Sequence, residues 1–470
     1  MEKLKVGLVG LMHANFTGDK EAIFSKAKED INKFADNLNF NLHIANKQLI
    51  TEEDAKSVYN ELEKSELDFL LVFNAQFASG KIISELADLT EYIGLWAVSE
   101  TTKAGPLPLN SFCGMNMNAS ILTEYIGHNK YKWFYGNDDL FLERFKITIN
   151  ALQAVKSLKK KRMALIGGIA QGFDNQYYDE RKIRDRFQVD ILRNLEFSDL
   201  KQRALSYSGS EVNEIHKKME NYASLINVDD KAIENTLRVV KAIKDFSNEL
   251  DLSGIALECW PKFRMEMDMV ACAAIGFLNH LDIVTACEGD VYGLLSMYLL
   301  NKLSNKPSLL MDLVDFDRKD QSVQFWHCGV GCPELACGEK IEISPHFNPA
   351  EVPDQGLVEH APVSEMIFKP GQGTITRITK EGEALFLLNG EFFDVDKPGF
   401  DGSRGWFKNL KLNDNSIQVK DLVNTIMVKG MQHHYAVGLG DYSSEMLEIA
   451  AWLDIKPLEK VDYQDYLQLE

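Results

Sequence analysis

Two acidic segments follow strand-like apolar runs, and they carry the side chains best suited to metal or proton-transfer chemistry. The first holds Glu258, after the apolar run 254–257, and the second is the turn 287–293, with Glu288 and Asp290 beside glycines. Open α/β sheets bind ligands at the carboxyl ends of their strands, so the two segments can share a site if their strands are neighbours. Carboxylates there could hold a hard divalent cation and act as general acid and base.

Histidines would add affinity for transition metals at such a site. Among the ten histidines, the adjacent pair His433 and His434 lies at the start of a predicted strand in the last part of the chain. Neighbours on a strand face opposite sides, so we expect only one of the pair to point into a given site. Taken singly, a glutamate at a strand end is most often a cap or an ion-pair partner, and such histidines are most often surface or core residues. The joint pattern favours a functional site.

Other familiar chemistries have weaker support. The seven cysteines are an odd number, several lie inside apolar runs, and 328, 332 and 337 do not have zinc-site spacing, so reduced thiols are expected. The glycines at 167, 168 and 172 are too irregular for a dinucleotide fingerprint, and no phosphate-binding P-loop is present.

The elements that position these residues alternate between strand and helix over the first 300 residues, which predicts parallel sheets. Expected strands are 6–11, 40–45, 67–73, 94–98, 162–167, 254–259 and 282–287, and expected helices are 20–37, 179–187, 229–249 and 266–281. Beyond about residue 307 glycine and proline recur between short alternating segments, among them 374–378, 384–388 and 424–428. This texture predicts a largely antiparallel barrel or sandwich.

Composition excludes several classes of partner. The chain has 470 residues, enough for two to four domains, and 51 basic minus 70 acidic residues give a net charge of −19. Such a surface repels nucleic acid and anionic lipid, and the only basic run, 159–162, is short. No apolar stretch approaches the roughly 20 residues that span a bilayer, and the start resembles a first strand and not a signal peptide. We therefore expect a cytoplasmic protein that binds neither nucleic acid nor membrane.

Four motifs, 258–261, 287–293, 327–329 and 433–437, together with 167–184, resemble the L-fucose/L-arabinose isomerase superfamily in order and spacing, and most closely its fucose-isomerase-like branch. The resemblance covers most of the chain. It implies two Rossmann-like parallel-sheet domains, 1–158 and 159–306, followed by a mainly antiparallel β-barrel-like domain, 307–470. It also implies a homo-oligomer, a trimer or hexamer, with the site near a subunit interface.

The same resemblance implies an aldose–ketose isomerase that uses Mn²⁺, with Mg²⁺ or Co²⁺ as alternatives. Glu258 and Asp290 match the acidic metal ligands and the catalytic acid and base, and His434 matches the histidine ligand. Some related sequences have Gln in place of Glu258. The expected substrate contacts are Gln171, Trp260, Arg264, Tyr292, His327, His433 and, in the first domain, His13. Core packing is an equal alternative for Trp260.

Chemistry alone leaves the route open between proton transfer through a cis-enediolate and a metal-assisted hydride shift, since both use the same ligands. L-fucose, L-arabinose and sulfoquinovose, a sulfonated glucose, are all candidate sugars. An anionic substrate would need Arg264, Arg181, Arg184 or Arg404 to point inward. Two other functions fit part of the pattern: a sugar-binding or sensor protein, and a metal-dependent aldolase or dehydratase.

Overall fold

The computed structural model describes residues 3–136, 139–225, 228–338, 341–345, 361–393 and 395–464. The chain divides into two units, Met1–Ser157 and Leu158–Glu470. The second unit holds both the segment predicted as a second Rossmann-like domain and the segment predicted as β-rich.

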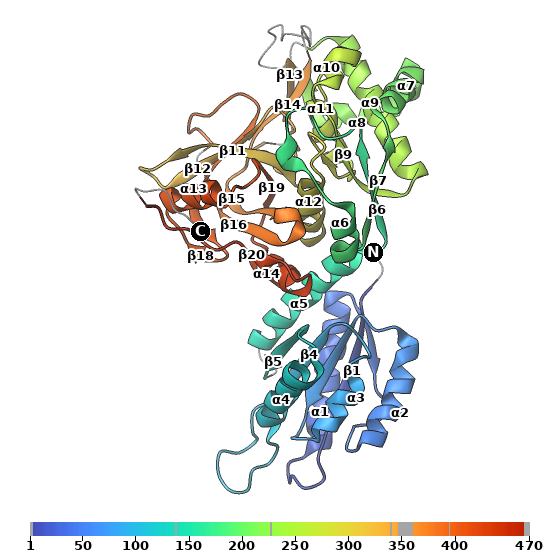
Figure 1. Ribbon diagram of the computed structural model, residues 1–470, viewed down its shortest axis with the longest axis vertical. Coiled ribbons are helices and arrows are strands. Elements are labelled where there is room, and N and C mark those ends of the chain that lie inside the picture. The colour runs from blue at the N-terminus through green and yellow to red at the C-terminus, as the bar shows by residue number, and fades with distance from the viewer. Residues whose placement is uncertain are drawn as a thin grey trace. The chain divides into compact units, whose positions relative to one another are not determined.

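The first unit is built on a five-stranded parallel sheet with strand order β2-β1-β3-β4-β5 (Figure 1). The strands are β1 (Lys5–Leu11), β2 (Asn41–Ile44), β3 (Phe69–Asn74), β4 (Ile93–Ala97) and β5 (Tyr131–Tyr135), and the helices are α1 (Lys20–Leu38), α2 (Glu52–Leu62), α3 (Gly80–Leu86), α4 (Ser111–Ser120) and α5 (Asp139–Leu158). The predicted parallel α/β arrangement is confirmed here.

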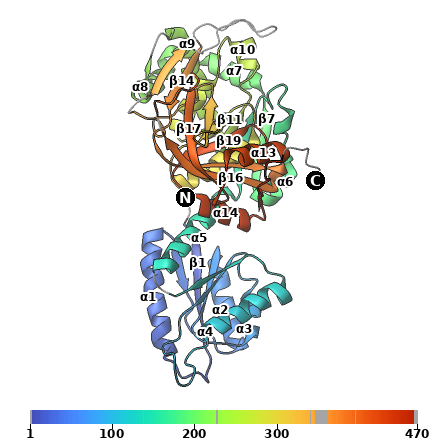
Figure 2. The same cartoon turned by 90° about the vertical axis from the view of Figure 1, so that its left-hand side faces the viewer.

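Helices cover both faces of this sheet, as Figure 2 shows for α1 on one side and for α2, α3 and α4 on the other. An aliphatic cluster that includes Val58, Ile82 and Leu95 fills the second side. Aromatic rings of α1 and α5 fill the first, where Trp96 stacks on Phe141 at 4.6 Å between ring centroids. Strands buried on both faces explain the nearly continuous apolar runs in the sequence.

The second unit begins with a four-stranded parallel sheet of order β10-β9-β6-β7. Its strands are β6 (Lys161–Ile166), β7 (Val189–Leu195), β9 (Leu252–Leu257) and β10 (Thr285–Ala286), and its helices are α6 (Glu180–Phe187), α7 (Phe197–Ser206), α8 (Asn213–Tyr222), α9 (Asp230–Glu249), α10 (Lys262–Met267), α11 (Cys272–His280) and α12 (Val291–Ser304). The single helix predicted over 266–281 is two helices, because Asp268 takes a left-handed φ of 52° and ends α10.

The remainder of the second unit is a mixed sheet of order β20-β16-β15-β19-β11-β12-β17-β14-β13-β8, with β18 paired to β17. The strands are β8 (Ala223–Leu225), β11 (Leu309–Asp317), β12 (Ser322–His327), β13 (Ile341–Pro345), β14 (Pro362–Ile367), β15 (Gly371–Thr379), β16 (Ala384–Phe393), β17 (Ser403–Leu412), β18 (Asn415–Ser416), β19 (His434–Leu439) and β20 (Lys456–Pro457), with helices α13 (Val419–Val428) and α14 (Ser443–Trp452). Although β16 also pairs with β17, strands β14, β13 and β8 extend the path beyond β17. The mixed α/β fold is confirmed, and closure of this sheet into a barrel is not.

The strand predicted over 424–428 is wrong, because this segment is the last half of helix α13. Its alternation of polar and apolar residues also fits a helix period, since Val419, Leu422 and Thr425 are buried at spacings of three. The Thr425 hydroxyl donates to the Asp421 carbonyl one turn earlier, as helical threonines do.

Helix α12 lies between the parallel sheet and the mixed sheet and joins the two halves of the site. Its residues from Val291 to Leu300 are all buried, which explains why its sequence is apolar on every side. Gly438 of β19 lies so close that an added Cβ would stand 3.0 Å from Leu300. Within the described part of the chain, no helix is long and apolar enough to cross a membrane.

Candidate active site

The two acidic segments meet at one edge of the parallel sheet, as the sequence predicts. Strand β10 pairs with β9, with Ala286 opposite Ala256, so the residues that follow each strand are neighbours. Gly289 N donates to Leu257 O at 3.0 Å, which ties the turn after β10 to the end of β9. The loop after β6 lies against the same edge, because Ala170 N donates to Glu288 O at 3.1 Å.

The turn after β10 requires glycine at position 289. Glu288 and Gly289 both have left-handed backbone angles, with φ of 59° and 71°. A Cβ added at Gly289 would stand 2.3 Å from the carbonyl oxygen of Gly168. Glycine therefore provides both the backbone conformation and the close approach of the β6 loop.

Glu288 presents its carboxylate to both histidines of the pair. Its Oε2 lies 3.2 Å from His433 Nε2 and 3.4 Å from His434 Nε2. The expectation that only one of the pair faces the site is wrong, because β19 begins at His434 and strand alternation does not apply to His433. Gln176 Nε2 donates to the same Glu288 oxygen at 3.3 Å.

Asp290 contacts the Nδ1 atom of His434 and forms an ion pair with the buried Arg377. Its Oδ2 lies 3.2 Å from His434 Nδ1 and 2.6 Å from Arg377 Nη1, and its Oδ1 accepts from Gly293 N at the start of α12. Asp290 and Arg377 are each only 1% exposed in their side chains. An Nδ1–H donated to Asp290 leaves the lone pair of His434 Nε2 facing Glu288, which is the arrangement of histidine ligands in metal sites.

A second group of donor atoms also lies near His434 Nε2. Asp312, which pairs with His434 across β11 and β19, has Oδ1 at 3.7 Å from this nitrogen. Cys287 Sγ lies 3.2 Å from His327 Nε2 and 3.9 Å from His434 Nε2. Asp312 Oδ1 and His327 Nδ1 are buried atoms without a hydrogen-bond partner among the described residues.

The surroundings of the carboxyl groups of the site shift their pKa values in different directions. Burial opposes ionisation of Glu288, but the imidazoles of His433, His434 and His327 outweigh it and lower its pKa. Burial also opposes ionisation of Asp290, and the Arg377 guanidinium leads the groups that hold its pKa well below the usual range. At Asp312 burial prevails and raises the pKa. The pKa of His434 is raised, because its carboxylate neighbours outweigh the opposing effect of burial.

Glu258 follows β9 and lies against the loop after β6. Burial raises its pKa above the ordinary glutamate value, although Lys262 Nζ, 2.7 Å from Oε2, acts in the opposite direction. Lys262 also donates to Gly167 O at 3.0 Å. Among the described residues Glu258 makes no ion pair with the histidines, so it flanks the donor group without joining it.

The remaining predicted contacts are dispersed. Arg264 is buried with its guanidinium 5.7 Å from the Trp260 ring, next to the Glu258 segment. Gln171 is exposed, whereas Gln176, five residues later, is the buried glutamine at the site. Tyr292 is buried beside Gly382, and His13 belongs to the first unit, where its backbone N–H donates to Gln76.

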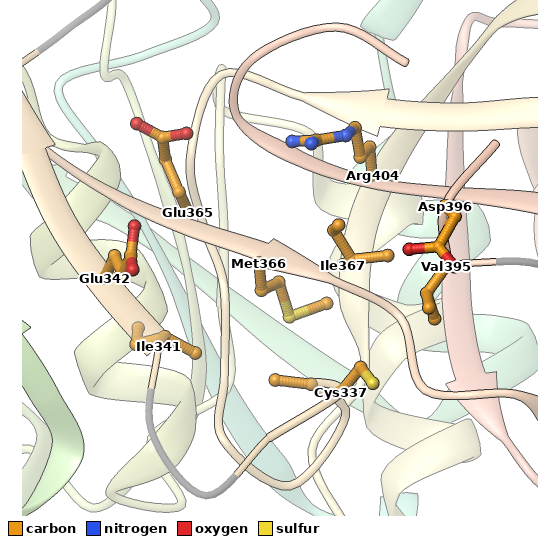
Figure 3. A pocket seen from close by; sticks show the side chains of 10 residues that line it. Cys337, Ile341, Glu342, Glu365, Met366, Ile367, Val395, Asp396 and Arg404 are labelled. Atoms are coloured by element: carbon orange, nitrogen blue, oxygen red, sulfur yellow. The ribbon is translucent and has the colours of Figure 1, made fainter. Parts of the chain in front are cut away.

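The other candidate arginines lie in surroundings that suit an anion poorly. Figure 3 shows Arg404 in a pocket of about 340 Å³ that it shares with the carboxyl groups of Glu342, Glu365 and Asp396. Arg181 is exposed, and Arg184 forms an exposed ion pair with Asp190 at 2.8 Å. Three acidic groups that line the same pocket would repel a sulfonate.

Sequence reasoning missed four residues of the site. Glu288 was within the correct turn, but its left-handed backbone, which turns its carboxylate to the histidines, has no sequence signal. Asp312 and Arg377 lie inside strands and carry no motif, and they reach the site only through pairing in the mixed sheet. Gln176 lies in the same loop as Gln171, the predicted contact, and only burial distinguishes the two.

The donor atoms fit a divalent cation. Glu288, His433 and His434 form one group whose ligand atoms lie within 4.8 Å of one another, and Cys287, His327 and His434 form another. Carboxylates with imidazoles suit Mn²⁺ and related ions. The buried Asp312 Oδ1, which has no hydrogen-bond partner among the described residues, is a second observation that favours a cation site, since buried polar atoms normally have partners.

Comparison with known proteins gives consistent results. No family model matches the chain. Sulfoquinovose isomerases of Priestia megaterium and Alkalicoccus urumqiensis are 25% and 26% identical to it, over 88% of this chain and 90% of each relative. A sulfoquinovose isomerase of Clostridium sp. is 25% identical over 82% of this chain and 85% of the relative. The chain is a homologue of the sulfoquinovose isomerases. This homology confirms the resemblance given by the motifs and the predicted enzyme class, aldose–ketose isomerase.

Solved structures add nothing to this conclusion. A periplasmic solute-binding protein from Actinobacillus succinogenes with bound D-allose is 12% identical, covers 65% of this chain and 94% of its own, and has a TM-score of 0.17. A periplasmic sugar-binding protein from Pseudomonas fluorescens has a TM-score of 0.15 at 13% identity, covering 64% of this chain and 77% of its own. Scores this low carry no argument for the fold or for the sugar-binding alternative.

Proposed function

We propose that the protein is a divalent-metal-dependent isomerase that interconverts sulfoquinovose and its ketose. The isomerase homologues support the reaction, and their names support the sulfonated sugar as substrate. The observation on the structure that carries the proposal is the donor group of Glu288, His433 and His434, with Glu258 against the loop that follows β6.

Glu288, His433 and His434 would hold the cation, with Mn²⁺ as the best match to a mixed carboxylate and imidazole set. His434 keeps its predicted role. Asp290, which the sequence predicts as a metal ligand and catalytic group, has a positioning role in this proposal, because Arg377 and the α12 N-terminus engage both of its oxygens. A bound divalent cation would polarise the sugar carbonyl and offset negative charge on O1 and O2.

Glu258 is the proton-transfer group of the proposal. Isomerisation moves a proton between C1 and C2, and a carboxylate whose pKa is raised by burial is a better base than an ordinary glutamate. Gly167 leaves room for Glu258, because an added Cβ there would stand 2.8 Å from its Oε2. Asp290 and Arg377 position His434, and Gln176 holds Glu288.

Recognition of the sulfonate is assigned to the basic residues beside Glu258. Arg264 and Lys262 lie on helix α10, directly after the Glu258 segment. The Arg264 guanidinium lies over Trp260, whose ring could also contact sugar C–H groups. A planar guanidinium with several donors suits an anionic head group.

The test is product analysis. Metal-stripped protein is incubated with and without Mn²⁺, in D₂O, with sulfoquinovose and with neutral aldoses, and ketose formation and C2 deuteration are followed by NMR. We expect a ketose of unchanged composition from the sulfonated sugar, only with metal, and deuterium at C2 if a cis-enediolate forms. Cleavage or dehydration products would favour a lyase, and binding without turnover would favour a sugar-binding protein. The homo-oligomeric state stays a prediction, which light scattering tests.

A further inference from the structure

Cys287 has no part in the proposed reaction, yet its thiol lies inside the site. It immediately precedes Glu288, and its Sγ lies 3.2 Å from His327 Nε2 and 3.9 Å from His434 Nε2. Cys287, His327 and His434 are all buried, and their ligand atoms lie within 4.8 Å of one another. Cys287 is only 1% exposed, so its thiol group does not contact solvent.

The chemistry of this group differs from that of the Glu288 group. A thiolate and two imidazoles are the donors that zinc-type cations prefer, whereas Mn²⁺ and Mg²⁺ prefer carboxylates. His327 supports a ligand role, because it is 3% exposed and its Nε2 lies 3.2 Å from Cys287 Sγ. The buried Asp312 Oδ1 lies 3.7 Å from His434 Nε2, so a carboxylate oxygen is also present beside the group.

We propose that Cys287, His327 and His434 form a second cation site, selective for thiophilic divalent ions such as Zn²⁺. Binding would release the thiol proton and form a metal–sulfur bond, with no change of oxidation state. Both sites need the lone pair of His434 Nε2, so one ion excludes the other. Zn²⁺ would therefore displace the cation held by Glu288 and inhibit the enzyme. Only this inhibitory consequence rests on the proposed function.

The neighbouring thiol of Cys259 is a separate feature. Its Sγ accepts a hydrogen bond from the backbone N–H of Glu288 at 3.3 Å, so it supports the turn. Cys332 is a matched control for Cys287, because it is a fully buried thiol elsewhere in the second unit, where it donates to Gly276 O at 3.4 Å.

The first experiment uses the unmodified full chain and needs no activity. Metal-stripped protein is loaded with one equivalent of Zn²⁺ or of Mn²⁺, and each sample is measured by X-ray absorption fine structure at its metal edge. We expect one sulfur neighbour for zinc, at about 2.3 Å, and none for manganese. A zinc shell of nitrogen and oxygen alone would overturn the proposal.

The second experiment measures metal affinities of three variants by competition with a chromogenic chelator, after circular dichroism has verified their fold. Cys287→Ser should lower Zn²⁺ affinity by at least about 100-fold and Mn²⁺ affinity much less, and Cys332→Ser should change neither. Glu288→Gln should lower Mn²⁺ affinity more than Zn²⁺ affinity.

If Cys287→Ser and Glu288→Gln each lower the affinities for Zn²⁺ and Mn²⁺ equally, the two ions share one site and the proposal is overturned. If zinc binds through sulfur but Mn²⁺ supports no isomerisation, the zinc site stands and the proposed function fails.

Discussion

The Asp290–Arg377 pair offers the sharpest stability prediction, because both side chains are nearly inaccessible. Replacing Arg377 by Met removes two bonds to Asp290 and one to His434 O, and leaves a buried carboxylate without its cation. Breaking a buried ion pair on one side costs about 3–5 kcal/mol. We expect Arg377→Met to destabilise the second unit locally by that amount.

Hydrogen exchange is the suitable assay, since a chain of two units need not unfold in a single transition. Amides of α12 and β15 flank the pair, and a loss of about 3 kcal/mol or more should speed their exchange by at least about 100-fold. Arg184→Met is the control, because the Arg184–Asp190 pair is exposed and such pairs contribute at most about 1 kcal/mol.

The double variant Arg377→Met with Asp290→Asn separates pairing from packing. Asn keeps an oxygen for the α12 N-cap while it removes the charge. The double variant should therefore be more stable than the sum of the single changes predicts, by up to about 3 kcal/mol. Additive effects, or α12 exchange in Arg377→Met no faster than in Arg184→Met, would refute the reasoning.

Three further predictions concern the site. Gly289→Ala should reduce metal affinity and thermal stability far more than Gly430→Ala. Both glycines have positive φ, but of the two only Gly289 has a backbone atom within 4 Å of an added Cβ. Equal effects of the two substitutions would show that the close approach of the β6 loop does not require glycine at position 289. Lys262→Met should move the acid limb of the kcat/KM profile to higher pH, because the ammonium lowers a Glu258 pKa that burial raises, and an unmoved limb would exclude Glu258 as the base. Arg264→Ala should lower kcat/KM for the sulfonated sugar by about tenfold or more with little change for a neutral aldose, and equal turnover of the sulfonated sugar would exclude Arg264 from its recognition.

Much of the fold could be predicted because apolar periodicity is a local property. The alternation of strands and helices indicates parallel sheets, and α1, α6 and α9 have almost the predicted bounds. The same periodicity fails at 424–428, where five residues fit either a strand or a helix, and burial at spacings of three shows the helix.

The site was predictable only where local sequence carries the signal. An acidic turn after a strand identifies 287–293, and a histidine pair identifies His434. That Glu288 lies at the Nε2 atoms of the histidines, and Asp290 at His434 Nδ1, has no local signal, because Glu288 and Gly289 take left-handed angles and Arg377 engages Asp290 from a strand 87 residues away. A contact between residues so far apart in the sequence cannot be recognised from either segment alone.

The most direct test of the central claim is a Mn²⁺ titration of metal-stripped protein, in which electron paramagnetic resonance counts free Mn²⁺ while NMR follows ketose formation from sulfoquinovose in the same samples. We predict that turnover rises in proportion to bound Mn²⁺ up to one ion per chain, and that Glu288→Gln binds the ion at least about tenfold more weakly. Full turnover before any Mn²⁺ is bound, or wild-type affinity in Glu288→Gln, would contradict the account.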